Sequence, residues 1–171
     1  QVRTWNSAGF GPWSDPKSFT VSPPTPTRTP TSTATALPTL INLGGKSDIG
    51  YTSAIAVRGQ YAYVGAGNQG KVFKVLNISN PAAITEVASL PPFSYAIEDI
   101  YLSGDYAYLA AREDGLQIVR IADPNFPSLV GSETSRPAFG VCVLNNLAYV
   151  VHNVTGVSSI DVSDPTNPSV V

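Results

Sequence analysis

The sequence predicts an all-β protein in which a four-stranded unit occurs about three times. Three observations support this prediction: a motif recurs at a nearly constant interval, apolar residues alternate with polar ones over short runs, and turn-forming residues separate these runs. Alternation with a period of two places successive side chains on opposite faces of a strand. The units occupy the chain from residue 38 to residue 171.

Each unit carries an aromatic motif, then a glycine, then an Asn-Pro or Asp-Pro corner. The aromatic position recurs at Tyr63, Tyr108 and Tyr149, the glycine at Gly70, Gly115 and Gly156, and the corner at residues 80–81, 123–124 and 164–165. Successive tyrosines lie 45 and 41 residues apart, and so do successive glycines. A fixed order of marks at a nearly fixed interval indicates an internal repeat.

Each unit divides into four short strands. We expect the first strand at residues 54–57, 97–102 and 141–144, followed by a tight turn of Gly-Gln, Gly-Asp or Asn-Asn. These residue types tolerate the positive φ of hairpin turns. The aromatic motif forms the second strand, and a turn ending in glycine leads to the third, as at residues 116–121. An Asp-Pro-x-x-Pro corner then precedes a fourth strand such as residues 128–130.

Four strands and about 43 residues per unit are typical of a propeller blade. The predicted fold is therefore a partial β-propeller of about three four-stranded blades. Residues 38–42 match the fourth strand of a preceding unit, which indicates either a terminal strand that closes a ring or the remnant of a degenerate blade. Because propellers usually have 4 to 8 blades, we expect this chain to be an excerpt, truncated at both ends.

Residues 22–40 differ sharply in composition, because Pro, Thr and Ser fill 14 of the 19 positions. Such a stretch buries too little apolar surface to offset its ordering entropy. We therefore expect residues 22–37 to be a disordered Pro/Thr-rich linker, either a solvated tether or a stalk with O-linked sugar on threonine.

Residues 1–21 combine two alternating runs with a turn at residues 6–9, the pattern of a β-hairpin. Residues 2–9 (Val-Arg-Thr-Trp-Asn-Ser-Ala-Gly) and 11–16 (Gly-Pro-Trp-Ser-Asp-Pro), with Phe19 and Val21, resemble the last two strands of a fibronectin type III domain. The resemblance implies that residues 1–21 are the C-terminal remnant of such a domain, which takes about 100 residues when complete.

Residues 116–124 (Leu-Gln-Ile-Val-Arg-Ile-Ala-Asp-Pro) and 157–165 (Val-Ser-Ser-Ile-Asp-Val-Ser-Asp-Pro) resemble the LVIVD repeat. This repeat is found in surface and secreted proteins of bacteria and archaea and is expected to form propellers. The resemblance covers residues 38–171. Arg120 occupies the acidic position that Asp161 keeps, and the first copy, residues 73–81, departs further. The resemblance supplies no catalytic motif to place on this chain.

Composition excludes several classes of function. Ten Lys and Arg residues against twelve Asp and Glu leave a net charge of -2, so the basic stripe of a nucleic-acid binder is missing. One cysteine and one histidine rule out a disulfide framework and disfavour a zinc or haem site. No run approaches the roughly 20 apolar residues of a membrane helix. We expect no cofactor, no metal, no nucleic acid and no direct membrane insertion.

Residues 65–70 match G-x-G-x-x-G, the dinucleotide fingerprint. That fingerprint requires a helix to follow, so that its N-terminus faces the pyrophosphate, whereas residues 71–75 are expected to continue as a strand. The other two repeats keep only the final glycine. The pattern therefore predicts a turn rather than a phosphate site.

The remaining reactive residue types also favour structural roles. Glu98 and Asp99 are adjacent and should point to opposite faces, and Arg112, Glu113 and Asp114 suit a solvated loop tip. Asp123 and Asp164 precede proline and should cap their own turns. We expect a turn position without a nearby nucleophile for His152, and a small core position for Cys142. Asn77 and Asn153 begin glycosylation sequons, which chance accounts for in a Ser/Thr-rich β protein.

No catalytic, metal-binding or cofactor-binding residue is therefore predicted, and the ligand-binding residues are left open. The favoured function is a noncatalytic extracellular interaction or scaffold module of a prokaryotic cell-surface or secreted protein, with an unknown protein or glycan as partner. The alternative is an accessory region of a secreted hydrolase whose catalytic residues lie outside this fragment.

Overall fold

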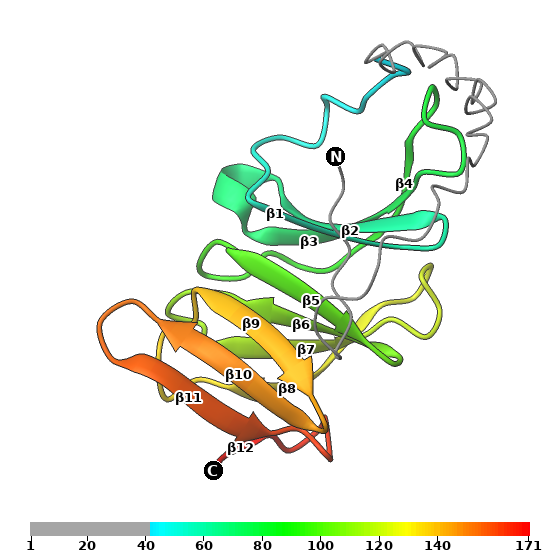
Figure 1. Ribbon diagram of the computed structural model, residues 1–171. Helices are drawn as coiled ribbons and strands as arrows, with labels where there is room; N and C mark the ends of the chain where they lie inside the picture. The colour runs from blue at the N-terminus through cyan, green and yellow to red at the C-terminus, as the bar shows by residue number, and fades with distance from the viewer. Residues whose placement is uncertain (1–41) are drawn as a thin grey trace, which may run out of the picture. The chain divides into compact units, whose positions relative to one another are not determined.

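The computed structural model describes residues 42–171, which form three four-stranded antiparallel sheets joined in sequence order (Figure 1). The strands are β1 (Ala54–Arg58), β2 (Tyr61–Ala66), β3 (Val72–Asn77) and β4 (Thr85–Ser89) in the first sheet; β5 (Asp99–Ser103), β6 (Tyr106–Ala110), β7 (Leu116–Arg120) and β8 (Ser128–Glu133) in the second; and β9 (Gly140–Leu144), β10 (Leu147–His152), β11 (Gly156–Asp161) and β12 (Ser169–Val170) in the third. A 3-10 turn, η1 (Asn68–Gly70), separates β2 from β3. The all-β, four-stranded repeat prediction is confirmed.

Several expected features lie outside the described residues. These are the fibronectin-like hairpin at 1–21, the linker at 22–37 and most of the strand expected at 38–42. The compact unit that contains the sheets begins at Leu40. The expected first strand of the second repeat begins at Asp99 instead of residue 97, because the Ile97 amide donates to the Gly70 carbonyl and not to β6.

The predicted hairpin turns are confirmed by their backbone conformations. Gly59 and Gly104 have φ angles of 57° and 51°, and Asn145 and Asn146 have φ angles of 51° and 64°. The two consecutive positive φ values at Asn145 and Asn146 are the signature of a type I′ turn, whereas the Gly-Gln and Gly-Asp turns have a positive φ at the glycine alone. The turn residues thereby fix the register of the first two strands in every sheet.

Each sheet has two faces, because side chains alternate along a strand. We call the face directed toward the preceding sheet the leading face and the opposite one the trailing face. In the second sheet, Ile100 and Leu109 lie on the leading face, whereas Tyr108 and Ile118 lie on the trailing face. Strand β5 lies beside both β1 and β9, so the first strands of the three sheets are neighbours.

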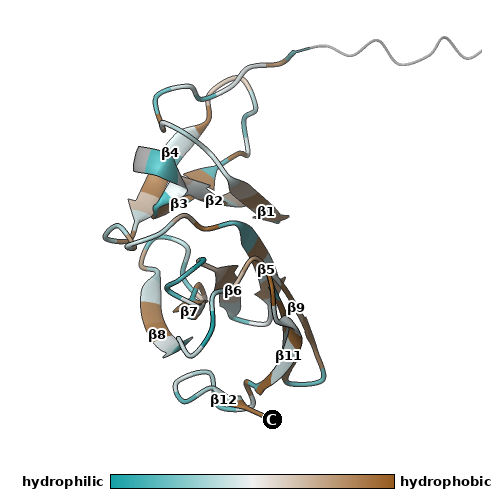
Figure 2. Ribbon diagram, turned by 90° about the vertical axis from the view of Figure 1, so that its left-hand side faces the viewer, coloured by the Kyte–Doolittle hydropathy of each residue, from teal (hydrophilic) through white to brown (hydrophobic). Residues whose placement is uncertain are grey.

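Two hydrophobic cores fill the spaces between the sheets. The first joins trailing-face residues of sheet one, including Phe73 and Val75, to leading-face residues of sheet two, including Leu109 and Val119. The second joins the trailing face of sheet two, including Ile118, to the leading face of sheet three. Figure 2 shows the hydrophobic colouring along β5, β6 and β9. The stability of the repeats therefore comes mainly from packing between sheets.

We predict that Leu109→Ala lowers the free energy of unfolding by about 2–5 kcal/mol, because Leu109 is fully buried between the first two sheets and its loss leaves a cavity. Denaturant unfolding measures the change. Leu129→Ala, at a half-exposed leucine of β8, is the matched control and should cost less than about 1 kcal/mol. Equal costs for the two substitutions would contradict packing between the sheets.

Candidate functional site

A candidate site lies in a cleft between the first and second sheets, which we call the inter-sheet cleft. It has a volume of about 810 Å³. Its lining includes Tyr51, Gln69, Lys71, Tyr95, Glu98 and Arg112. These residues come from four segments: the one before β1, the β2–β3 turn, the β4–β5 connection and the start of the β6–β7 connection. Four connections from one end of neighbouring sheets thus build the site.

Hydrogen bonds hold the cleft walls together. The Ser53 hydroxyl donates to the Ile97 carbonyl at 2.6 Å, and the Ile97 amide donates to the Gly70 carbonyl at 3.1 Å. The Glu98 amide donates to the Ala110 carbonyl at 2.7 Å. Because each bond joins the connection before β5 to one of the two sheets, the cleft is bounded by ordered backbone.

Arg112 is fixed on three sides. Its Nε lies 2.6 Å from Glu98 Oε1, and its guanidinium lies over the Phe139 ring, 5.7 Å from the centroid. Its backbone amide donates to the Ala138 carbonyl, and the Ala138 amide donates back to the Arg112 carbonyl. Arg112 lies beside the turn at Glu113 and Asp114 and is exposed, as expected. In addition, its guanidinium pairs with Glu98, which precedes β5 of the same sheet.

The backbone at Arg112 is in the left-handed region, with a φ of 49°. The equivalent residue of the first repeat, three positions before the recurring glycine, is Gly67, with a φ of 80°. A residue with a Cβ pays about 1–3 kcal/mol in this region, and such strain concentrates at functional sites. The chain thus places an arginine at the cleft where a glycine would fit without strain.

A second, smaller cavity of about 420 Å³ lies beside the β6–β7 turn and is lined in part by Phe93, Asp114 and Gln117. Asp114 Oδ2 accepts a hydrogen bond from the Tyr95 amide at 2.9 Å, and the buried Gln117 amide group donates to the Asp114 carbonyl. Asp114 is therefore a structural residue, whereas Arg112 and Glu113 are both exposed, as expected for a solvated loop tip.

Glu98 and Asp99 do not act as a pair. Glu98 binds Arg112, whereas Asp99 Oδ2 accepts a hydrogen bond from the Val141 amide at 2.9 Å and so ties β5 to β9. Asp123 and Asp164 cap their own turns, as predicted, through the Asn125 and Thr166 amides. The hydrogen bond from the Thr166 hydroxyl, together with that from its amide, lowers the pKa of Asp164 below its ordinary value.

The expectation for His152 is wrong. It is the last residue of β10 rather than a turn residue, and it is only 5 % exposed because it continues the leading-face series of Ala148 and Val150. Its Nδ1 lies 2.6 Å from the Pro137 carbonyl oxygen and its Nε2 lies 2.7 Å from Ser158 Oγ. Sequence reasoning missed Ser158 because the contact crosses diagonally from β10 to β11.

The His152–Ser158 pair has the side chains of a general base and a nucleophile, but its position in the fold indicates a structural role. A carbonyl oxygen can only accept a hydrogen bond, so Nδ1 of His152 carries a proton and donates to the Pro137 carbonyl. Nε2 then accepts a hydrogen bond from the Ser158 hydroxyl. Neither residue lines either of the two main cavities in the described part of the chain. The pair therefore satisfies polar groups between the second and third sheets.

Cys142 is exposed, so the expectation of a small core position for this residue is wrong. It alternates with the buried Val141 and Val143, which face sheet two, so its own side chain points from the trailing face of sheet three. The G-x-G-x-x-G stretch behaves as predicted. Its last glycine has a φ of 74°, and β3 rather than a helix follows.

Within residues 42–171, no group of three or more His, Cys, Asp or Glu side chains is arranged to hold a metal ion. The same part of the chain contains no helix with the length and apolar character that a membrane crossing demands.

Three similar sheets packed in series define a propeller-like repeat protein. The LVIVD repeat model matches residues 49–90, 96–134 and 135–171, so the chain belongs to the LVIVD repeat family. These boundaries follow the three sheets closely. No curated protein sequence matches the chain.

Solved structures support the fold. The computationally designed Ika4 protein superposes with a TM-score of 0.57 at 9 % identity, covering 74 % of this chain and 73 % of that one. A structural genomics protein of unknown function from Bacteroides thetaiotaomicron VPI-5482 superposes with a TM-score of 0.50 at 15 % identity, covering 70 % of this chain and 31 % of that one. The chain thus spans about a third of the Bacteroides protein. At these identities the likeness concerns the fold alone.

We predict that Arg112→Gly is more stable to unfolding than Arg112→Ala by about 1 kcal/mol. Both variants lose the Glu98 ion pair and the Phe139 contact, but only glycine relieves the left-handed backbone at this position. Thermal melts of the two variants make the comparison. An alanine variant as stable as the glycine variant would show that this position carries no strain.

We predict that His152→Ala and Ser158→Ala are coupled by about 1 kcal/mol in a double-mutant cycle of denaturant unfolding, because each substitution leaves the other residue's polar atom without its partner. A serine-directed organophosphorus reagent should leave Ser158 unmodified. Labelling of Ser158 would indicate a reactive nucleophile and contradict the structural role.

Proposed function

We propose that the chain is a noncatalytic interaction module of an extracellular prokaryotic protein, and that it binds a glycan in the inter-sheet cleft. The observation that carries the proposal is Arg112, whose backbone is strained and whose side chain pairs with Glu98, in a cleft that also presents two exposed tyrosines. A strained residue held by the surrounding structure favours a role in binding over a role in folding.

The chemistry of the cleft suits a sugar. The Tyr51 and Tyr95 rings offer apolar faces for stacking, and each also carries a hydroxyl. Gln69, Lys71, Glu98 and Arg112 supply donors and acceptors around them. In such a site the aromatic surface contributes affinity, and the few polar groups fix the orientation of the ligand. A sugar suits both, because it carries hydroxyl groups on a ring with apolar faces.

The proposal of a noncatalytic role rests on how the acidic groups are used. Glu98 is neutralised by Arg112, and Asp99 is bonded to the Val141 amide. Glycoside hydrolysis needs two carboxyl groups that face one substrate across a defined gap. These carboxylates instead bind protein groups, which favours retention of a ligand over its conversion. The resemblance to the LVIVD repeat, which implies a surface or secreted protein, supports the proposed extracellular location.

We predict that a screen of soluble bacterial-envelope and plant-cell-wall oligosaccharides by isothermal titration identifies a ligand, and that Tyr95→Ala weakens its binding at least tenfold. Tyr95 is 42 % exposed and lies in the cleft, whereas Tyr101 is 37 % exposed and lies on β5 outside it. Tyr101→Ala is therefore the matched control and should bind as the wild type does. The ligand should be recovered intact by mass spectrometry after long incubation.

Two results would overturn the proposal. Cleavage of the ligand by the purified chain would show an enzyme. Equal loss of binding in the Tyr95 and Tyr101 variants, or binding of a peptide but of no oligosaccharide in the screen, would show that the cleft is not a glycan site.

A further inference from the structure

We propose that the inter-sheet cleft selects glycans that carry a carboxylate, such as oligomers of uronic acids, and that the guanidinium of Arg112 binds this carboxylate. The inference rests on the proposed function and narrows its ligand from glycans in general to acidic ones. Three features of the cleft support it: the sign of its charge, the part of Arg112 that remains accessible, and the absence of an ion pair at Lys71 within residues 42–171.

The charged side chains that line the cleft give it a positive balance. They are Lys71, Glu98 and Arg112, and the other lining residues are neutral. Because Glu98 pairs with Arg112, one carboxylate stands against two cations. The whole chain has a net charge of -2, so the cleft is opposite in sign to the chain. A cleft of this charge attracts an anionic ligand.

Arg112 can bind Glu98 and a ligand carboxylate at the same time. The ion pair with Glu98 is made through Nε, and 46 % of the Arg112 side chain is exposed. The terminal nitrogens Nη1 and Nη2 form the edge of a guanidinium that donates two parallel hydrogen bonds to a carboxylate. Glu98 and the Phe139 ring already orient the side chain, so less rotamer freedom is lost when a ligand binds.

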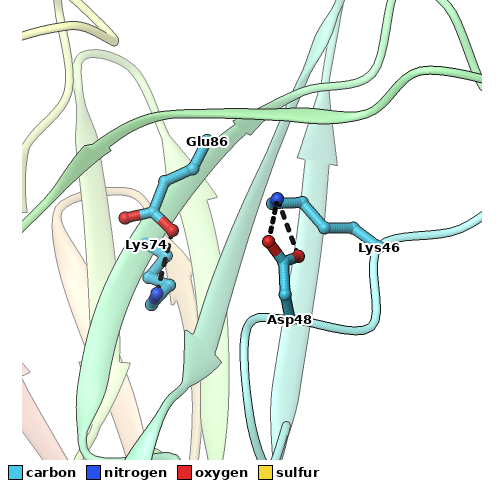
Figure 3. A network of polar contacts seen from close by, with 4 residues as sticks. All are labelled: Lys46, Asp48, Lys74 and Glu86. Atoms are coloured by element: carbon cyan, nitrogen blue, oxygen red, sulfur yellow. Dashed lines mark hydrogen bonds and ion pairs between the residues drawn. The ribbon is translucent and has the colours of Figure 1, made fainter.

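Lys71 supplies a second cation to the cleft. Residues 42–171 contain three lysines, and two of them form ion pairs, Lys46 with Asp48 and Lys74 with Glu86 (Figure 3). Lys71 lines the cleft and forms no ion pair with any residue in that range. Its charge is therefore available to an anionic ligand in the same cleft that Arg112 lines.

The aromatic lining directs this charge toward a sugar. Tyr51 is 65 % exposed and Tyr95 is 42 % exposed, and both line the cleft. Their rings can stack on the apolar face of a sugar ring. A uronic acid meets both requirements, because its carboxylate is attached to the ring that stacks. The cleft volume of about 810 Å³ lies within the range of about 300–1,000 Å³ that is usual for ligand pockets.

Isothermal titration of the 171-residue chain with acidic oligosaccharides and their methyl esters tests the inference. The probes are oligomers of galacturonic, glucuronic and mannuronic acid, each beside its ester, which keeps the ring and removes the charge. We expect at least one acid to bind about tenfold or more tightly than its ester. Arg112→Gln should remove this preference, and Arg112→Lys should restore only part of it, because lysine keeps the charge without the paired donors.

Arg120→Gln is the matched control. Arg120 is an exposed arginine at the end of β7 that does not line the cleft, and its substitution changes the net charge by the same amount. This variant should keep the preference for the acid. Lys71→Gln is a second test in case Arg112→Gln loses its fold, which circular dichroism reports, and it should weaken binding of the acid but not of the ester.

The outcomes separate this inference from the function on which it rests. Acid and ester bound equally well would overturn the selection of acidic glycans and leave a glycan site in place. A preference that persists in both Arg112→Gln and Lys71→Gln would do the same. A chain that binds no oligosaccharide would overturn both proposals. Binding of polyglutamate as tightly as the acidic oligosaccharides would show that the cleft recognises charge without a sugar ring, which also overturns both.

Discussion

The structure depends on the burial of each sheet's faces against neighbouring sheets. A four-stranded sheet with apolar side chains on both faces is not stable in water alone, and its strands need a covering layer on each side. Here the middle sheet is covered on both faces, and its strands β6 and β7 each have four buried residues out of five. The two end sheets each have one face covered by a neighbour. Cooperativity between repeats follows, as in other repeat proteins where each unit contacts only its neighbours.

The same constraint positions the functional surface. Packing between sheets fixes the strands, so the connections at one end of neighbouring sheets are brought together and form the inter-sheet cleft. There the chain departs from the most stable choice of residue, because Arg112 occupies a left-handed backbone position that the first repeat gives to glycine. Local departures from backbone preference in an otherwise regular fold are expected at functional sites. The rigid sheets hold the strained residue in place, and Glu98 and Phe139 hold its side chain.

Much of the fold could be predicted from the residues because it depends on local chemistry. Alternation, turn residues with positive φ and the Asp-Pro corners each report on a few adjacent positions, and the three sheets follow from their recurrence. The site could not be predicted in this way. Arg112 meets Glu98 beyond the paired ends of β5 and β6, and His152 meets Ser158 across a strand pair. Cys142 is exposed because its face has no neighbouring sheet in the described structure. These contacts depend on which faces meet in space, and no spacing in the sequence encodes that.

Native-state hydrogen exchange of the strand amides tests the central claim most directly, namely that the sheets are stabilised by one another. The account predicts that the amides of β6 and β7 exchange only through global unfolding, whereas the outer strands β4 and β12 exchange faster through local opening. Denaturant should raise the exchange rate of the β6 and β7 amides in step with global unfolding. If the middle sheet instead exchanged no more slowly than the end sheets, with each sheet opening at its own free energy, packing between sheets would not be what holds the structure together.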